Sequence, residues 1–188
     1  MRKKAFSRTE ITSSGSGDVW FFAYGSLLWA PEFRVVQRCR AHLFGWHRRF
    51  CVNSIRYRGT AQAPGLVLGL DHGGSCVGLA LKISASERDE VLAKLTLREM
   101  PEEIYTCRPV KLRISNRTIS AITLIVNRDH RLYSPVRNIN KMAERIASSV
   151  GDRGSNKEYL ENTVSSLADA GINDCALSLL LDRVRGLG

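Results

Sequence analysis

The pattern of apolar residues changes along this chain from strand-like to helix-like, and that order limits the folds that it can adopt. Before Pro135, the apolar stretches are short, rich in β-branched and aromatic residues, and bounded by turn-forming residues. After Pro135, apolar residues recur at helical spacing over 139–150, 157–170 and 174–184. Strands followed by helices predict an α+β domain in which an antiparallel sheet curls toward a barrel. The chain has no βαβ rhythm and no G-x-G-x-x-G sequence, which argues against a dinucleotide-binding fold.

Several strands and turns can be assigned in the first part of the chain. Val19–Ala23 predicts a first strand, and residues 34–52, with a glycine inside, predict two strands and a bend. The stretch 66–83 has "DHGG" between two apolar runs, which predicts a hairpin. A second hairpin is predicted around "SNRT", with strands over 105–114 and 119–126.

Capping and breaking residues predict where helices begin and end. Ser84 or Ser86 is predicted to cap a helix that runs to about Glu99, because Pro101 discourages continuation. These boundaries put Glu99 at the end of an otherwise apolar helical stripe. Asn156 is the predicted N-cap of the second C-terminal helix.

The length of 188 residues is sufficient for one domain with a sizeable core. Residues 1–18 are basic and rich in Ser and Gly, with no apolar stretch behind them, so we predict a disordered tail and not a secretory signal. Residues 19–188 are predicted to form a single domain. No apolar stretch reaches the roughly 18 residues of a membrane helix, so no membrane association is expected.

The cysteines and histidines do not form the spacings of a metal site. The five cysteines include no C-x-x-C pair, and the four histidines are scattered along the chain. We therefore expect neither a metal nor a disulfide framework, and a reducing cytoplasm is the predicted location.

A formal net charge of +10 raises the question of an acidic partner. Between Phe33 and Leu70 the chain has several arginines, interleaved with aromatic residues, and no Asp or Glu. Such a stretch could contact phosphates and stack on bases. The arginines also alternate with apolar residues, as on solvated strand faces, and no nucleic-acid-binding motif accompanies them. Nucleic acid is therefore not the expected partner, and a non-enzymatic protein with a basic binding surface is kept as the alternative from another functional class.

Two local features are candidates for chemistry. The apolar run "WFFAYGSLLW" is interrupted by Tyr24, Gly25 and Ser26, where a glycine permits close approach of a ligand. Free N–H groups at such a strand end can bind a carboxylate or an oxyanion. Glu99 is the second feature, because a partly buried carboxyl group suits general acid–base catalysis. A simple turn and a solvated helix end beside Arg98 remain the simpler explanations of the two patterns.

Several separated segments together resemble the ChaC-type γ-glutamylcyclotransferases. They are "FAYGSLLWAPEF", "YRGTAQAPGLVLGLDHGGSCVGLALKI", "LREMPEEIY" and "GSNKEYLENTVSSLADAGINDCALSLL", in the family's order and spacing, and the similarity spans about residues 19–181. The resemblance implies a γ-glutamylcyclotransferase-like fold, a mixed β-barrel with flanking helices and C-terminal helices. It also implies a lyase of glutathione catabolism that cleaves glutathione to 5-oxoproline and cysteinylglycine without a metal or cofactor.

The resemblance further implies which residues form the site. The family's catalytic glutamate, in its Arg-Glu-Met motif, corresponds to Glu99. The implied substrate-binding residues belong to the loop at the break, its two neighbours and two later tyrosines: Ala23, Tyr24, Gly25, Ser26, Leu27, Leu28, Tyr105 and Tyr133.

The chain departs from the family pattern in several places. Ala23 stands where the family usually has glycine, Ala61 and Gln62 stand where it commonly has Pro and Glu, and the segment 101–104 stands where it tends to have glycine. The last two differences leave the preference among γ-glutamyl substrates open, so another γ-glutamyl peptide or amine is the alternative substrate. The oligomeric state is not predicted.

Overall fold

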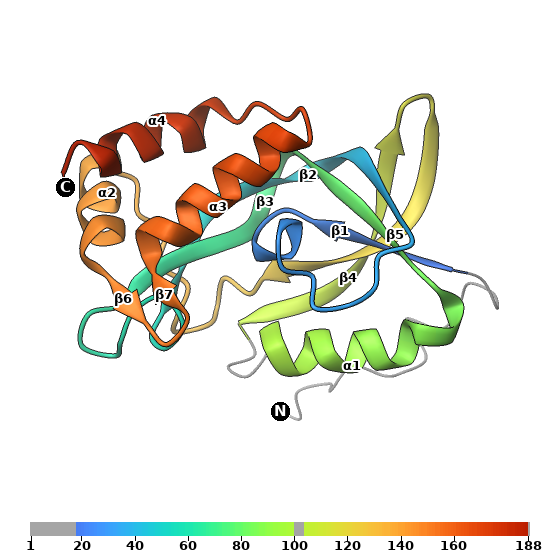
Figure 1. Ribbon diagram of the computed structural model, residues 1–188, viewed down its shortest axis with the longest axis horizontal. Helices are drawn as coiled ribbons and strands as arrows, with labels where there is room; N and C mark the ends of the chain where they lie inside the picture. The colour runs from blue at the N-terminus through green and yellow to red at the C-terminus, as the bar shows by residue number, and fades with distance from the viewer. Residues whose placement is uncertain (1–17, 100–103, 188) are drawn as a thin grey trace.

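Five strands close into a mixed barrel (Figure 1). The computed structural model describes residues 18–99 and 104–187, with the backbone alone described at residues 92 and 96–99. β1 runs parallel to β5 and antiparallel to β3, whereas the other neighbouring strands are antiparallel. The α+β barrel is therefore confirmed; the tail expected over 1–18 lies outside the described residues, except for Asp18. The strands are β1 (Val19–Ala23), β2 (Gln37–Ser54), β3 (Gly65–Ile83), β4 (Tyr105–Ile114) and β5 (Arg117–Val126).

The two longest strands are continuous where the sequence predicts interruptions. Two strands and a bend are predicted over 34–52, but β2 is a single strand. A hairpin is predicted over 66–83, but β3 continues through "DHGG". Both halves of β3 pair with β2, so Gly73 and Gly74, with φ of 99° and 66°, bend the ladder beside Gly45 and do not reverse it. These two predictions are wrong because glycines with positive φ serve a bulge as well as a turn.

The other predicted elements of the barrel region are confirmed. β4 and β5 form the hairpin around "SNRT", which turns at Ser115 with a φ of 51°. The helix predicted from Ser84 or Ser86 starts as a short 3-10 turn, η3 (Ala85–Glu87), and continues as α1 (Arg88–Glu99). In Figure 1, α1 lies along the lower side of the barrel, beneath β4.

The C-terminal helices pack together on another side of the barrel (Figure 1). They are α2 (Ile139–Ser148), α3 (Asn156–Asp169) and α4 (Cys175–Arg185), and a small hairpin of β6 (Val150–Gly151) and β7 (Gly154–Ser155) joins the first two. All the predicted C-terminal helices are confirmed. Among the helices of the described residues, none combines the length and apolar character that crossing a bilayer requires.

Side-chain caps define the start of each C-terminal helix. Asn138, Ser155 and Asp174 each accept a hydrogen bond from a backbone N–H of the turn that follows. The prediction of Asn156 as a cap is therefore wrong. Its buried side chain instead accepts a hydrogen bond from the Leu66 N–H (2.6 Å) and donates one to the Leu66 carbonyl (2.7 Å). The amide has one donor side and one acceptor side, so it joins the start of α3 to β3 as a backbone pair would.

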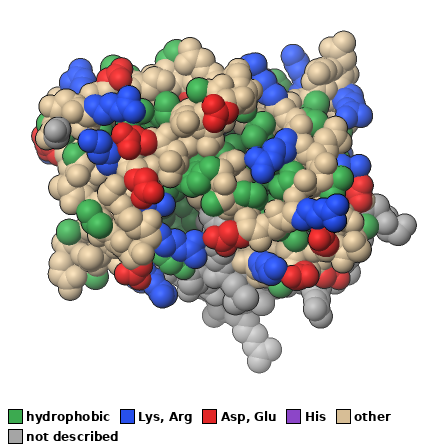
Figure 2. Space-filling model, in the orientation of Figure 1, with side chains coloured by type: hydrophobic (Ala, Val, Ile, Leu, Met, Phe, Trp, Pro, Cys, Tyr) green, Lys and Arg blue, Asp and Glu red, His purple; other side chains and the backbone are tan. Residues whose placement is uncertain are grey.

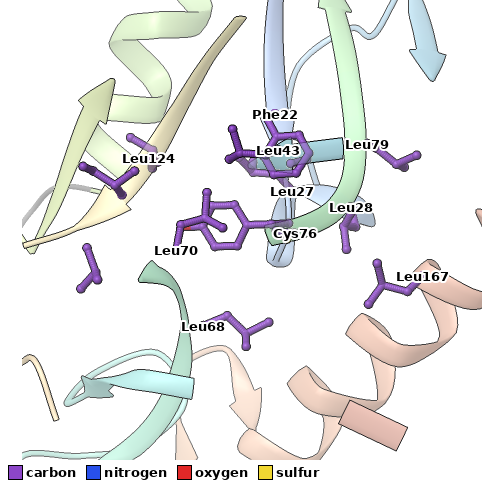
Figure 3. Packing of buried hydrophobic residues seen from close by; sticks show 14 of the residues in the cluster. Phe22, Leu27, Leu28, Leu43, Leu68, Leu70, Cys76, Leu79, Leu124 and Leu167 are labelled. Atoms are coloured by element: carbon purple, nitrogen blue, oxygen red, sulfur yellow. The ribbon is translucent and has the colours of Figure 1, made fainter. Parts of the chain in front are cut away.

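The barrel and the C-terminal helices share one hydrophobic core (Figure 3). Phe22 of β1 is fully buried, and Leu28, from the 3-10 turn η2 (Ser26–Leu28), is 2% exposed. In Figure 3, Leu27 and Leu28 lie close to Phe22 and Leu79, and Leu167 points toward them from α3. The chain that leaves β1 is thus anchored by apolar burial immediately after its polar break.

A buried carboxylate joins β3 to the segment that follows β5. The side chain of Asp71 in β3 is 0% exposed and bonds to Arg128, Arg49 and the Tyr133 hydroxyl, the last at 2.8 Å. Burial by itself would raise the pKa of Asp71, but the hydrogen bonds from Arg128 and Tyr133 hold this pKa below its ordinary value. Asp71 is therefore charged in the folded protein, and its partners compensate for its burial.

We expect Asp71→Asn to lower the free energy of unfolding by about 3 kcal/mol at pH 7, since the buried carboxylate loses its charge-assisted hydrogen bonds to Arg128 and Tyr133. The lowered pKa means that the contribution of Asp71 is complete above the ordinary carboxyl pKa and is lost as the pH falls through the lowered value. Urea denaturation at pH 7, and at successively lower pH from about pH 4 downward, measures both effects.

Asp152→Asn is the matched control, because Asp152 is an exposed partner of Arg56. This variant should change the free energy of unfolding by less than about 0.5 kcal/mol. If both variants lost the same small amount of stability, the structural role of Asp71 would be refuted.

Candidate active site

A cavity of about 380 Å³ lies at one end of the barrel. Its lining comes from the C-terminal ends of β1, β2 and β5 and from the N-terminal ends of β3 and β4. These ends meet at one rim because β3 and β4 run opposite to the other strands. Residues after β1 and β2, Tyr159 of α3, and Ile104, Leu132 and Arg153 from other connections complete the wall. The volume is in the range of small-molecule sites, about 300–1,000 Å³.

The polar break after β1 forms one wall of this cavity. The ladder between β1 and β3 ends at the pair Ala23–Leu79, and Tyr24, Gly25 and Ser26 then line the cavity. The Leu28 N–H donates to the Gly25 carbonyl (2.9 Å), which closes the 3-10 turn. A Cβ at Gly25 would lie 3.2 Å from the hydroxyl oxygen of Tyr159, so a larger residue would require this hydroxyl to move by a few tenths of an ångström.

Two tyrosine hydroxyls bind the same residue of β3. The Tyr105 hydroxyl donates to the Leu68 carbonyl (2.8 Å), and the Tyr159 hydroxyl accepts from the Leu68 N–H (3.3 Å). All of these residues line the cavity. The tyrosines therefore bring β4 and α3 to the start of β3, and their rings form part of the cavity wall.

Charged residues border the cavity on its solvent side. Arg56, Arg58 and Arg153 line it there, and Glu32 is the acidic residue among the described lining residues. Arg153 lies 4.5 Å above the Tyr57 ring and pairs with Glu32 at 3.5 Å. Arg58 is more enclosed, with 12% of its side chain exposed, and a carboxylate of α3 binds it at 2.9 Å. Figure 2 shows hydrophobic side chains gathered near the middle of this view, with Lys, Arg, Asp and Glu side chains around them.

A protein-family model described as "ChaC-like protein" matches residues 19–187. The chain belongs to the ChaC-like protein family. It is 33% identical over 187 residues to a glutathione-specific γ-glutamylcyclotransferase of Escherichia coli (strain K12), a match that covers 99% of this chain and 81% of that protein. It is 31% identical over 152 residues to glutathione-specific γ-glutamylcyclotransferase 1 of Danio rerio, covering 78% of each chain. The resemblance to this family is therefore confirmed.

A solved structure supports the architecture of this ChaC-like protein. The crystal structure of a selenomethionine-labelled γ-glutamyl cyclotransferase specific to glutathione, from yeast, superimposes with a TM-score of 0.83 at 23% identity. The match covers 90% of this chain and 96% of the yeast chain. At this identity the likeness shows the fold, and it confirms the mixed barrel with flanking helices.

The cavity of the ChaC-like chain collects most of the residues of the predicted loop. Ala23 and Leu28 flank the lining residues, at 0% and 2% exposure, and are packed in the core. Glu99 is the last residue of α1, and its side chain lies outside the described part of the structure. The predicted residues that line the cavity are Tyr24, Gly25, Ser26, Leu27 and Tyr105.

Tyr133 lies beside the cavity wall and not among its described lining residues. Its hydroxyl donates to Asp71, and its backbone forms an isolated bridge with Val52. Burial, together with the hydrogen bond to Asp71, raises the pKa of Tyr133. The neighbouring Leu132 lines the cavity instead.

Sequence reasoning missed several lining residues. Tyr159 sits at a buried position of a helical stripe, a pattern that indicates core packing. Trp29, which meets the Tyr159 ring edge-on at 5.5 Å, and Arg58 lie in segments that resemble the family. Those segments were the available signal, but their spacing alone does not reveal which side chains face a cavity. Within the described residues, no group of three or more His, Cys, Asp and Glu side chains is arranged to hold a metal ion.

We expect Tyr105→Phe to lower the free energy of unfolding by about 1 kcal/mol, because the buried Leu68 carbonyl loses a donor. Tyr57→Phe is the control, since the ring that stacks under Arg153 is preserved; it should stay within about 0.5 kcal/mol of the wild type. Urea denaturation followed by far-UV circular dichroism measures both values. Equal stability of the wild type and Tyr105→Phe would show that this hydrogen bond does not hold β4 to β3.

Proposed function

We propose that this ChaC-like protein is a γ-glutamylcyclotransferase, a lyase that cleaves glutathione into 5-oxoproline and cysteinylglycine. The observation that carries the proposal is the loop Tyr24–Leu27 in the wall of the cavity, in a chain of this family. The relatives from Escherichia coli and Danio rerio carry the name of this activity. The cavity volume of about 380 Å³ suits a tripeptide that enters with one end.

The reaction is an internal acyl transfer. The α-amino nitrogen of the γ-glutamyl group attacks its own γ-carbonyl carbon, and a carbon–nitrogen bond closes a five-membered lactam. The bond from the γ-carbonyl carbon to the cysteinyl nitrogen breaks, and that nitrogen accepts a proton to leave as an amine. The protein need supply no nucleophile, but it has to hold the glutamyl chain folded, an orientation effect that can be large.

In this proposal the loop after β1 holds the γ-glutamyl group. Backbone N–H groups around Gly25 and Ser26 bind the α-carboxylate or the oxyanion that develops on the γ-carbonyl. The rings of Tyr105 and Tyr159 limit the space beside the loop, which favours the folded form of the glutamyl chain. Ala23 and Leu28 support the loop from the core, whereas Tyr133 binds Asp71 and so joins the segment after β5 to β3.

Glu99 is proposed as the general acid and base. The α-amine is protonated at neutral pH, so a base takes its proton before attack, and the same group returns a proton to the leaving nitrogen. Glu99 ends α1, and Ile104, which lines the cavity, follows five residues later. A chain segment of that length spans at most about 18 Å, which is the upper limit on the distance between the backbones of Glu99 and Ile104.

The leaving half of glutathione carries a second carboxylate, on its glycyl residue. The arginines at the solvent side of the cavity, Arg56 and Arg153 above all, provide positive charge for it. Ala61 and Gln62, which depart from the family pattern, lie in an exposed turn after Arg58 and are not among the described lining residues. The proposal of glutathione over substrates that lack the second carboxylate therefore rests on the arginines that line the cavity.

Other γ-glutamyl peptides or amines remain the alternative substrates, and comparison of glutathione with γ-glutamyl-alanine separates the two. Salt-dependent retention on DNA or RNA, with no turnover of any γ-glutamyl compound, would instead support a binding protein. We also propose that the enzyme works in the cytoplasm, since all five cysteines are unpaired. The proposed reaction is an internal acyl transfer, for which the residues named above suffice without a cofactor.

We expect Glu99→Gln to keep the fold and to lower kcat for glutathione by at least about 10²-fold, the usual contribution of a general acid–base group. Mass spectrometry of 5-oxoproline and cysteinylglycine measures turnover, and circular dichroism checks the fold. Glu90→Gln is the matched control on the same helix; Glu90 pairs with Lys94 (2.7 Å), and its variant should keep normal activity. Near-normal turnover by Glu99→Gln would end the assignment of Glu99.

We also expect kcat/KM for glutathione to fall steeply as salt rises from about 20 to 500 mM, because the net charge of +10 attracts an anionic substrate and salt screens this attraction. Initial rates at low substrate concentration, in increasing sodium chloride, measure the effect. The same series in potassium chloride controls for effects of a specific ion. A kcat/KM independent of ionic strength would show that the charge does not serve substrate capture.

A further inference from the structure

Arg48 is a buried cation directly behind the loop that lines the cavity. It lies in β2, only 4% of its side chain is exposed, and it is not among the described lining residues. Its guanidinium donates to the Tyr24 carbonyl (2.7 Å), to the Val77 carbonyl (2.6 Å) and to the Asp174 carboxylate (2.7 Å). Each bond uses a different nitrogen, so the planar group is held in one orientation.

The bond to Tyr24 determines which way the next peptide N–H points. In a trans peptide unit, the carbonyl and the following N–H point to opposite sides. The Tyr24 carbonyl points to Arg48, away from the described cavity lining, so the Gly25 N–H points to the other side of the loop. Gly25 lines the cavity and Arg48 does not, so we infer that the side of the loop opposite Arg48 is the one that faces the cavity.

We propose that Arg48 is a positioning residue for this loop: by binding the Tyr24 carbonyl it turns the Gly25 N–H into the cavity as a hydrogen-bond donor for substrate. The role rests on the proposed function, because the acceptor is an oxygen of the γ-glutamyl group. A preorganised donor of this kind stabilises negative charge without reorganisation during the reaction.

Arg48 also links this donor to the C-terminal helices. Asp174 is the N-cap of α4: one oxygen accepts from the Leu177 N–H (3.2 Å) and the other binds Arg48. The peptide at Tyr24 is therefore fixed between a strand of the barrel and a helix that approaches from outside. A lysine carries its three donors on one nitrogen, so it does not match the three directions in which the separate nitrogens of Arg48 donate.

The test compares Arg48→Lys with Arg40→Lys. Arg40 is an exposed arginine of the same strand, and it binds the Gly171 carbonyl (3.1 Å) in the connection before α4. We expect Arg48→Lys to lower kcat/KM for glutathione at least about tenfold, since the loss of one donor to a developing oxyanion costs about 10²–10³. Arg40→Lys should remain within twofold of the wild type. If Arg48→Lys does not fold, Asp174→Asn is the second variant. It preserves an acceptor for the Leu177 N–H, removes the charge that binds Arg48, and should also lower kcat/KM.

A spectroscopic measurement separates positioning from a general loss of stability. The carbonyl ¹³C resonance of Tyr24 and the amide resonance of Gly25 should move in Arg48→Lys and stay in place in Arg40→Lys. Unchanged resonances, or a kcat/KM within twofold of the wild type in folded Arg48→Lys, would overturn the role of Arg48. Inactivity of the wild type would defeat the proposed function instead, and the carbonyl resonance would still show whether Arg48 orients the peptide.

Discussion

The long antiparallel ladder between β2 and β3 is the constraint on which the rest of the structure depends. It runs from Gln37–Lys82 to Ser54–Gly65, and it passes through bulges without breaking. Because both strands bend, they wrap around the core and bring their ends to the rim where β1 and β4 also open. The cavity wall is therefore a consequence of barrel closure, and the loops after β1 and β2 close its sides.

Buried charges attach the connecting segments to this ladder at two places. Asp71 on β3 binds the chain after β5, and Arg48 on β2 binds the chain after β1 and the start of α4. Each charge is compensated by an opposite charge and by further hydrogen bonds, a condition for burial without a large cost. The hydrogen bonds of Asp71 and Arg48 are directional, so they orient groups that apolar packing alone would leave free to rotate. The precision of the site depends on these polar contacts, whereas its shape depends on the barrel.

The local strength of each signal explains which elements could be predicted. The C-terminal helices have apolar stripes with clear breaks between them, and their positions were predictable to within a few residues. The hairpin of β4 and β5 has a short polar turn between β-branched runs and was equally clear. The glycines of "DHGG" led to the wrong prediction of a hairpin, because a bulge and a turn require the same backbone conformations. The difference between the two lies in which strand is the pairing partner. The prediction of Asn156 as a cap was wrong for a similar reason, since an amide at a helix start can cap the helix or bind a neighbouring strand.

The sequence by itself determined the α+β class, the family and the loop Tyr24–Leu27, because these depend on residue order and on motifs that survive without coordinates. Only the tertiary structure decided that Tyr105 and Tyr159 meet at Leu68, that Tyr133 binds Asp71, and that Arg48 lies behind the loop. These contacts join residues far apart in the chain, and nothing in local spacing encodes them. They arise when the barrel closes and the helices pack on it, because only then do strand ends, loop and helix share one rim.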